Sequence, residues 1–119
     1  MHLDNDPEDS RKIFVRPETV DEAQLLRDVM LGWRPAWKKV SFSEQLLQLE
    51  EVSSETTDFP NLRLTKRKLR WIGSNLIQRN RDYLYAGDNK EARLARKMAA
   101  AISGQLYPST RKKRQVGAG

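Results

Sequence analysis

The stretch KRKLRWIGSNLIQRNRDYLYAGDNKEARLARKMAAAISG, residues 66–104, decides the fold expected for this chain of 119 residues. Its apolar residues recur at helical spacing on both sides of Gly87, and Gly104 follows the second set. The two apolar faces are made of Leu69, Ile72, Leu76 and Tyr83 before Gly87 and of Leu94, Ala95, Met98, Ala101 and Ile102 after it. Because a single glycine separates them, the sequence predicts two antiparallel helices, 66–86 and 89–103, joined by a very short loop.

Two shorter helices are expected before this hairpin, at about 17–32 and 43–52. Pro17 suits the first turn of the earlier helix, which Gly32 and Pro35 would end. Ser41 with Glu44 three residues later matches a capping box for the later one. The expected core of all four helices consists of Leu26, Met30, Trp33, Phe42, Leu46, Leu49, Leu69, Ile72, Leu76, Tyr83, Leu94, Met98 and Ile102.

These segments together predict an all-α fold, a small four-helix domain over residues 11–106 with the hairpin at its C-terminal end. Residues 1–10 contain four acids and a proline with almost nothing to bury, which predicts a disordered acidic leader. Residues 107–119 lack an apolar period, which predicts a basic flexible tail. No segment alternates at period two for long enough to predict a strand, although residues 11–15 suit a short extended arm.

Several functional classes find little support in the composition. The chain has no cysteine, and its one histidine, His2, lies in the predicted leader, so neither a nucleophilic triad nor a zinc-thiolate site is expected. We therefore expect a protein that is not an enzyme and has no metal or cofactor. No apolar run approaches the ~18 residues of a membrane span, and the acidic N-terminus does not resemble a signal peptide. An intracellular location is expected: the cytoplasm, the nucleoid or, in a eukaryote, the nucleus.

The charges of the chain are divided between its two halves. Residues 1–60 hold 7 Lys/Arg and 13 Asp/Glu, whereas residues 61–119 hold 15 Lys/Arg and 3 Asp/Glu. A domain with such a basic part is typical of proteins that bind a polyanion. The sequence therefore predicts that the C-terminal half contacts nucleic acid and that the acidic N-terminal half contacts a protein partner.

The helix predicted over 66–86 has a second row of side chains, on the side away from its apolar face. The row runs along the helix for about 27 Å at a rise of ~1.5 Å per residue. It consists of Arg67, Trp71, Ser74, Gln78, Arg81 and Tyr85, with Lys66 and Arg70 beside it. Guanidinium groups bind phosphates, and aromatic rings stack on unpaired bases. Two interpretations stay open, because Trp71 and Tyr85 would equally suit packing against the N-terminal helices.

The helix predicted over 89–103 carries its cations opposite its apolar face. These are Lys90, Arg93, Arg96 and Lys97, and no acid interrupts the chain from Arg93 to Gln105. Ala100 lies among them and would let a phosphate backbone approach closely, although alanine is also simply the best helix former. The tail adds the cluster Arg111, Lys112, Lys113 and Arg114, which fits non-specific phosphate contact or nuclear localisation.

These observations predict a non-catalytic nucleic-acid-binding module, an accessory subunit of a larger nucleoprotein complex. RNA or another single strand is favoured over duplex DNA because aromatic residues alternate with the cations of the 66–86 helix. The alternative is an adaptor, assembly factor or inhibitor whose basic hairpin docks on an acidic protein. No membrane contact is expected.

Overall fold

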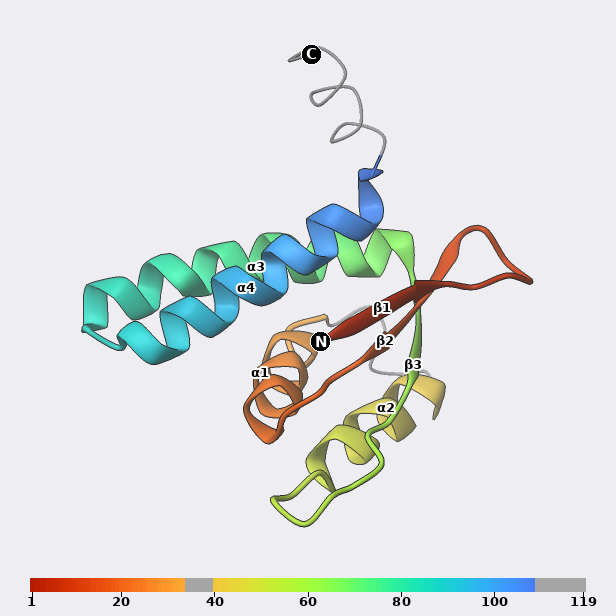
Figure 1. Ribbon diagram of the computed structural model, residues 1–119, viewed down its shortest axis with the longest axis horizontal. Coiled ribbons are helices and arrows are strands. Elements are labelled where there is room, and N and C mark those ends of the chain that lie inside the picture. The colour runs from red at the N-terminus through yellow and green to blue at the C-terminus, as the bar shows by residue number, and fades with distance from the viewer. Residues whose placement is uncertain (34–39, 109–119) are drawn as a thin grey trace. The chain divides into compact units, whose positions relative to one another are not determined.

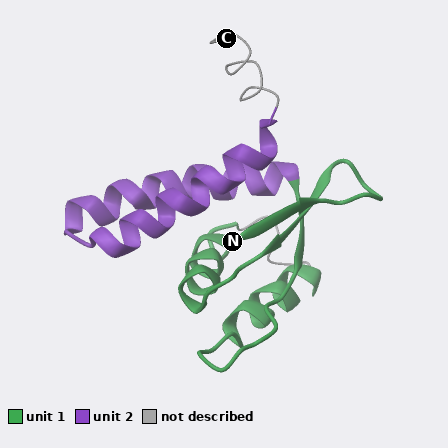
Figure 2. Cartoon of the chain, viewed as in Figure 1, with its two compact units in different colours: residues 1–65 green, residues 66–119 purple. Residues whose placement is uncertain are grey.

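The computed structural model describes residues 1–33 and 40–108 (Figure 1). Over these residues it contains four helices and one three-stranded antiparallel sheet. The prediction of an all-α fold is therefore wrong, although the chain is mostly helical. The chain divides into two compact units, Met1–Thr65 (unit 1) and Lys66–Gly119 (unit 2), as Figure 2 shows. The boundary lies inside the range 11–106 that the sequence predicted as one helical domain.

The sheet belongs to unit 1 and has the order β1-β2-β3. Its strands are β1 (His2–Asn5), β2 (Lys12–Arg16) and β3 (Leu62–Thr65). In the register, Ile13 faces Leu64 and Val15 faces Leu62. All four side chains are at most 1% exposed, so they form the buried face of the sheet. β2 thus lies within the segment predicted as a short extended arm, and it alternates buried and partly exposed residues over only five positions.

β1 and the following turn replace the predicted disordered leader. Asp6, in the turn, is only 5% exposed. Its carboxylate accepts hydrogen bonds from the backbone N–H of Glu8 (2.8 Å) and from Nε of Arg63 on β3 (2.6 Å). The Glu8 bond, and then the Arg63 guanidinium, lower the pKa of the Asp6 carboxyl against the opposing effect of burial. Asp6, which the sequence placed in a disordered leader, therefore connects the N-terminal residues to β3, nearly sixty residues later.

The two helices of unit 1 are α1 (Val20–Met30) and α2 (Val40–Glu50). α1 begins later than predicted because Thr19 is its N-cap, with Oγ1 accepting from the backbone N–H of Glu22 (3.1 Å). α2 begins earlier than predicted, so the expected capping box at Ser41 lies inside the helix. The buried apolar residues of the two helices are Ala23, Leu25, Leu26, Val29, Met30, Phe42 and Leu49, whereas the predicted core residues Trp33 and Leu46 are half-buried. The predicted connector between the helices lies largely outside the described residues.

Unit 2 is an antiparallel hairpin of α3 (Lys66–Ala86) and α4 (Asn89–Leu106). α3 has the predicted bounds, and α4 continues past Gly104 to end three residues later than predicted. Gly87 has φ of 83°, a left-handed conformation that favours glycine. The backbone N–H groups of Gly87 and Asp88 donate to the carbonyls of Leu84 (3.2 Å) and Tyr83 (2.8 Å), which is the Schellman pattern of a helix end.

The helices of the hairpin approach each other closely at Gly73 of α3. A Cβ atom at this position would lie 3.2 Å from Cγ2 of Ile102 on α4, closer than an ordinary contact. Near the loop, Nδ2 of Asn80 donates to the carbonyl of Ala92 across the pair (2.7 Å). The buried apolar residues of unit 2 are Leu69, Ile72, Leu76, Ala92, Ala95, Met98, Ala99 and Ile102, while the predicted core residues Tyr83 and Leu94 are half-buried.

Candidate nucleic-acid interface

The change in charge along the chain coincides with the boundary between the two units. Unit 1 holds 8 Lys/Arg and 13 Asp/Glu, a net charge of −5. Unit 2 holds 14 Lys/Arg and 3 Asp/Glu, a net charge of +11. The basic candidate residues therefore all belong to unit 2, whose described part is the hairpin (Figure 2).

The predicted row on α3 is largely accessible to solvent. Its exposed members are Arg67, Arg70, Ser74, Gln78, Arg81 and Tyr85. Lys66, at the first turn, is half-buried. Gln78 donates to the carboxylate of Asp82 (3.2 Å), the one acid within the α3 sequence. Most of the row is thus free to meet a ligand, while Gln78 already has a partner on its own helix.

The two aromatic residues of the row differ in exposure. Tyr85 is 95% exposed, so nothing in the described part of the chain covers its ring. Trp71 is half-buried and makes contacts of its own, and its carbonyl accepts a hydrogen bond from Nδ2 of Asn75 (2.9 Å). A base therefore has access to the face of Tyr85, whereas the Trp71 ring offers less of its surface for stacking.

On α4, the four predicted cations are all exposed. They are Lys90, Arg93, Arg96 and Lys97. Ala100 is exposed among them, as the sequence suggested, and Glu91 in the first turn is the helix's one acid. Such a face attracts phosphates and presents little steric hindrance to a nucleic-acid backbone near Ala100.

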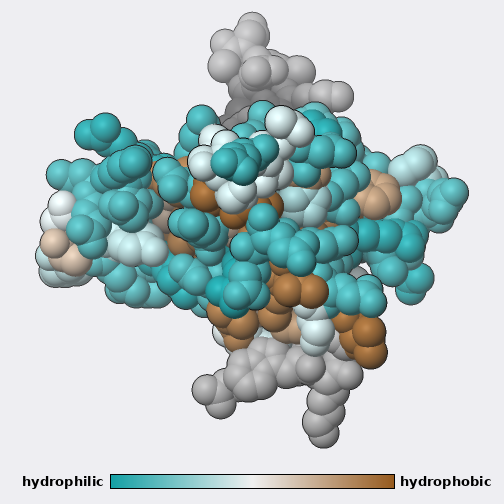
Figure 3. All heavy atoms as spheres, turned by 90° about the horizontal axis from the view of Figure 1, so that it is seen from below, coloured by the Kyte–Doolittle hydropathy of each residue, from teal (hydrophilic) through white to brown (hydrophobic). Residues whose placement is uncertain are grey.

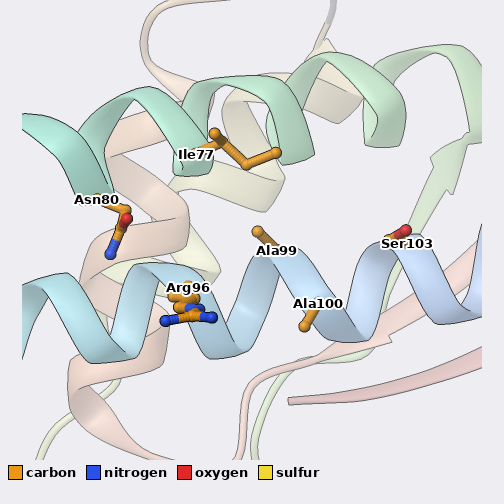
Figure 4. Close-up of a pocket in the computed structure, with 6 residues that line it drawn as sticks. All are labelled: Ile77, Asn80, Arg96, Ala99, Ala100 and Ser103. Carbon is orange, nitrogen blue, oxygen red and sulfur yellow. The ribbon is translucent and has the colours of Figure 1, made fainter.

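A shallow groove between α3 and α4 adds residues that the sequence did not single out (Figure 4). Its volume is about 320 Å³. It is lined by Ile77, Asn80, Arg96, Ala99, Ala100 and Ser103. Arg96 was predicted as a phosphate contact, and Ala100 was noted for its size. The spacing of small residues on α4, at 99, 100 and 103, was the signal that could have indicated a groove beside them.

The remaining candidates lie elsewhere. Arg111, Lys112, Lys113 and Arg114 are outside the described residues.

On the face drawn in Figure 3, hydrophilic residues predominate over the hydrophobic ones, in line with a mean hydropathy of −0.77. Within residues 1–33 and 40–108, no cluster of three or more His, Cys, Asp or Glu side chains is placed to hold a metal ion. In the same ranges, no helix has the length and apolar character that a membrane span requires.

Comparisons of this chain with protein-family models, with curated proteins and with solved structures found no match.

Proposed function

We propose that this protein is a non-catalytic nucleic-acid-binding module that contacts phosphates through the exposed cations of the α3–α4 hairpin. Single strands, and RNA in particular, are its favoured ligands over duplex DNA. The acidic unit 1 contacts a protein partner, and the chain acts inside the cell as an accessory subunit of a nucleoprotein complex.

The observation that carries this proposal is the net charge of +11 in unit 2 against −5 in unit 1. An ordinary soluble helical surface mixes its signs, because opposite charges spaced along a helix stabilise it. The described part of unit 2 has ten cations and three acids, and seven of those cations are exposed members of the two predicted faces. These cations repel one another, and the binding of a polyanion relieves that repulsion.

The preference for single strands is supported by Tyr85. This residue is 95% exposed and lies on the same side of α3 as Arg67, Arg70 and Arg81. Aromatic stacking on an unpaired base contributes about 1–3 kcal/mol, and every base offers a face for it. A base paired within a duplex does not present its face to a ring on a helix surface, so this contribution is restricted to single strands and loops.

A second candidate function is an adaptor or inhibitor whose hairpin docks on an acidic protein. Leu84 and Ile77 favour it, because they are 55% and 51% exposed on α3 and would be buried in a protein interface. Ile77 lines the same groove as the cation Arg96. The two candidate functions therefore use overlapping residues of the hairpin and differ in the ligand that binds there, a nucleic acid or an acidic protein.

The test is to titrate labelled single-stranded RNA, single-stranded DNA and duplex DNA with the full chain at low and physiological salt. We expect binding to all three, tightest for single strands and falling steeply with salt. Polyglutamate of matched charge serves as competitor, since it satisfies the cations but offers no base. The variant Arg93→Glu with Lys97→Glu should lose binding while its circular dichroism stays that of the wild type.

Two results would contradict the proposal. One is the absence of binding to all three nucleic acids at low salt. The other is displacement of RNA by polyglutamate at equal charge concentration, because the hairpin would then recognise negative charge alone, as the adaptor hypothesis requires.

A further inference from the structure

The groove between α3 and α4 combines an apolar surface with a cation (Figure 4). Ile77 is 51% exposed at its edge, and Ala99 and Ala100 add small apolar surfaces from α4. Arg96 lies among them, and no acidic residue lines the groove. A volume of about 320 Å³ is at the lower end of the range for small-molecule sites, so the groove has room for one compact group.

One polar group of the groove, the Asn80 amide, is held by a hydrogen bond. Asn80 donates through Nδ2 to the carbonyl of Ala92 (2.7 Å), which orients its amide and leaves Oδ1 as an acceptor. Figure 4 shows this amide between the two helices, with its nitrogen toward α4. Arg96 is exposed and forms no ion pair with any described residue of the chain. The groove therefore offers an oriented acceptor and an available cation next to an apolar surface.

This combination matches the chemistry of a nucleotide. The face of a base is apolar and flat, its edge carries N–H donors, and the attached phosphate is negative. An aliphatic side chain of a protein partner would use the apolar surface, but it would leave Oδ1 of Asn80 and the Arg96 guanidinium without partners. Covering a polar group without pairing it is unfavourable.

We propose that the α3–α4 groove binds one unstacked nucleotide of a single strand. The base lies against Ile77 and Ala100, an N–H on its edge donates to Oδ1 of Asn80, and its phosphate pairs with Arg96. This inference rests on the proposed function and names the subsite that separates single strands from duplexes. A duplex reaches the same cations with its phosphates but cannot place a base in the groove.

The experiment enlarges one side chain that lines the groove without changing charge. Ala100→Leu places a larger side chain at an exposed helical position, where leucine is well tolerated. Ala86→Leu is the matched control, because Ala86 is exposed at the end of α3 and does not line the groove. Fluorescence anisotropy with a labelled adenine-rich RNA 12-mer, alone and annealed to its complement, measures both affinities at one low salt concentration.

We expect Ala100→Leu to weaken single-strand binding about tenfold, and duplex binding less than twofold, while Ala86→Leu changes neither by more than about twofold. Single-strand affinity that is unchanged in Ala100→Leu would overturn the inference and leave the proposed function standing. Equal losses for single strand and duplex would also overturn it, because the leucine would then obstruct the phosphate backbone. A wild type that binds neither RNA would refute the proposed function, and this inference with it.

Discussion

Replacing Arg93 and Lys97 with glutamine should make the binding of single-stranded nucleic acid less sensitive to salt. Both side chains are exposed on α4, and neither lines the groove. Glutamine keeps a long polar side chain and high helix propensity, so the hairpin should stay folded. The change removes two of the cations that we expect to displace counterions from the phosphates.

The expected size of the effect follows from the exposed cations. These are Arg67, Arg70, Arg81, Lys90, Arg93, Arg96 and Lys97. If about six of them contact phosphates at once, the slope of log K against log salt is about −4 for a single strand, at roughly −0.7 per contact. Affinity then falls about 300-fold between 50 and 200 mM salt. With two contacts removed, the slope is about −2.8 and the loss over the same range is about 50-fold.

The assay is anisotropy of a labelled single-stranded RNA over at least four salt concentrations. Arg11→Gln with Arg16→Gln is the matched control, since it removes two exposed cations from unit 1 and lowers the net charge of the chain equally. We expect the slope of the control to equal that of the wild type. The reasoning is refuted if the control lowers the slope as much as the α4 pair does, because overall charge and not the hairpin surface would then determine binding.

Two further predictions concern stability. Gly73→Leu should destabilise the hairpin by about 1–3 kcal/mol, measured by urea denaturation, because even a Cβ at this position would lie 3.2 Å from Cγ2 of Ile102 and a leucine would crowd that contact further; equal or greater stability would refute the close approach. The folded-state pKa of Asp6 is below its ordinary value, so its contribution to stability is complete above that value and is lost as the pH falls through the lower one. Thermal denaturation of Asp6→Asn should accordingly depend less steeply on pH below about 4 than that of the wild type, and equal slopes would argue against the Arg63 and Glu8 contacts.

The hairpin was predictable because its signals are local. A helix of 21 residues repeats its apolar spacing several times, and Gly87 marks its end through a conformation that other residues rarely adopt. The end of α4 was less predictable. Gly104 suggested a stop, but glycine disfavours a helix interior by only about 1 kcal/mol, which packing of the preceding turns readily outweighs.

The sheet was not predictable because its signals are weak and distant. Its strands are four or five residues long, too short for alternation to stand out. β1 contains a single apolar residue, Leu3, among polar ones, so its strand conformation depends on pairing with β2. The contact of Asp6 with Arg63 joins residues 57 positions apart. No local pattern indicates such a contact. A reader of the sequence who does not know of the contact sees only an acidic segment of the kind that is usually disordered.

For the candidate interface, the sequence predicted which cations share a helix face, because helical geometry alone determines this. It did not determine whether Trp71 or Tyr85 was covered, since exposure depends on what packs beside each ring. The groove was likewise beyond prediction. It exists where small side chains of α4 meet Ile77 and Asn80 of α3, and such a meeting of two helices is not visible in the spacing of either one.

The two proposals assign affinity and selectivity to different parts of one surface. Exposed cations on both helices attract any polyanion, so they raise affinity for duplex and single strand alike. Selectivity requires groups that only an unpaired base can reach, and we propose two such places on the described hairpin, the exposed Tyr85 and the groove beside Ala100. Because Tyr85 lies near the loop end of α3 and does not line the groove, its loss and the filling of the groove should reduce single-strand affinity independently. A chain in which both changes left single-strand affinity intact would bind by charge alone, and it would then have no structural means of distinguishing a single strand from an acidic protein.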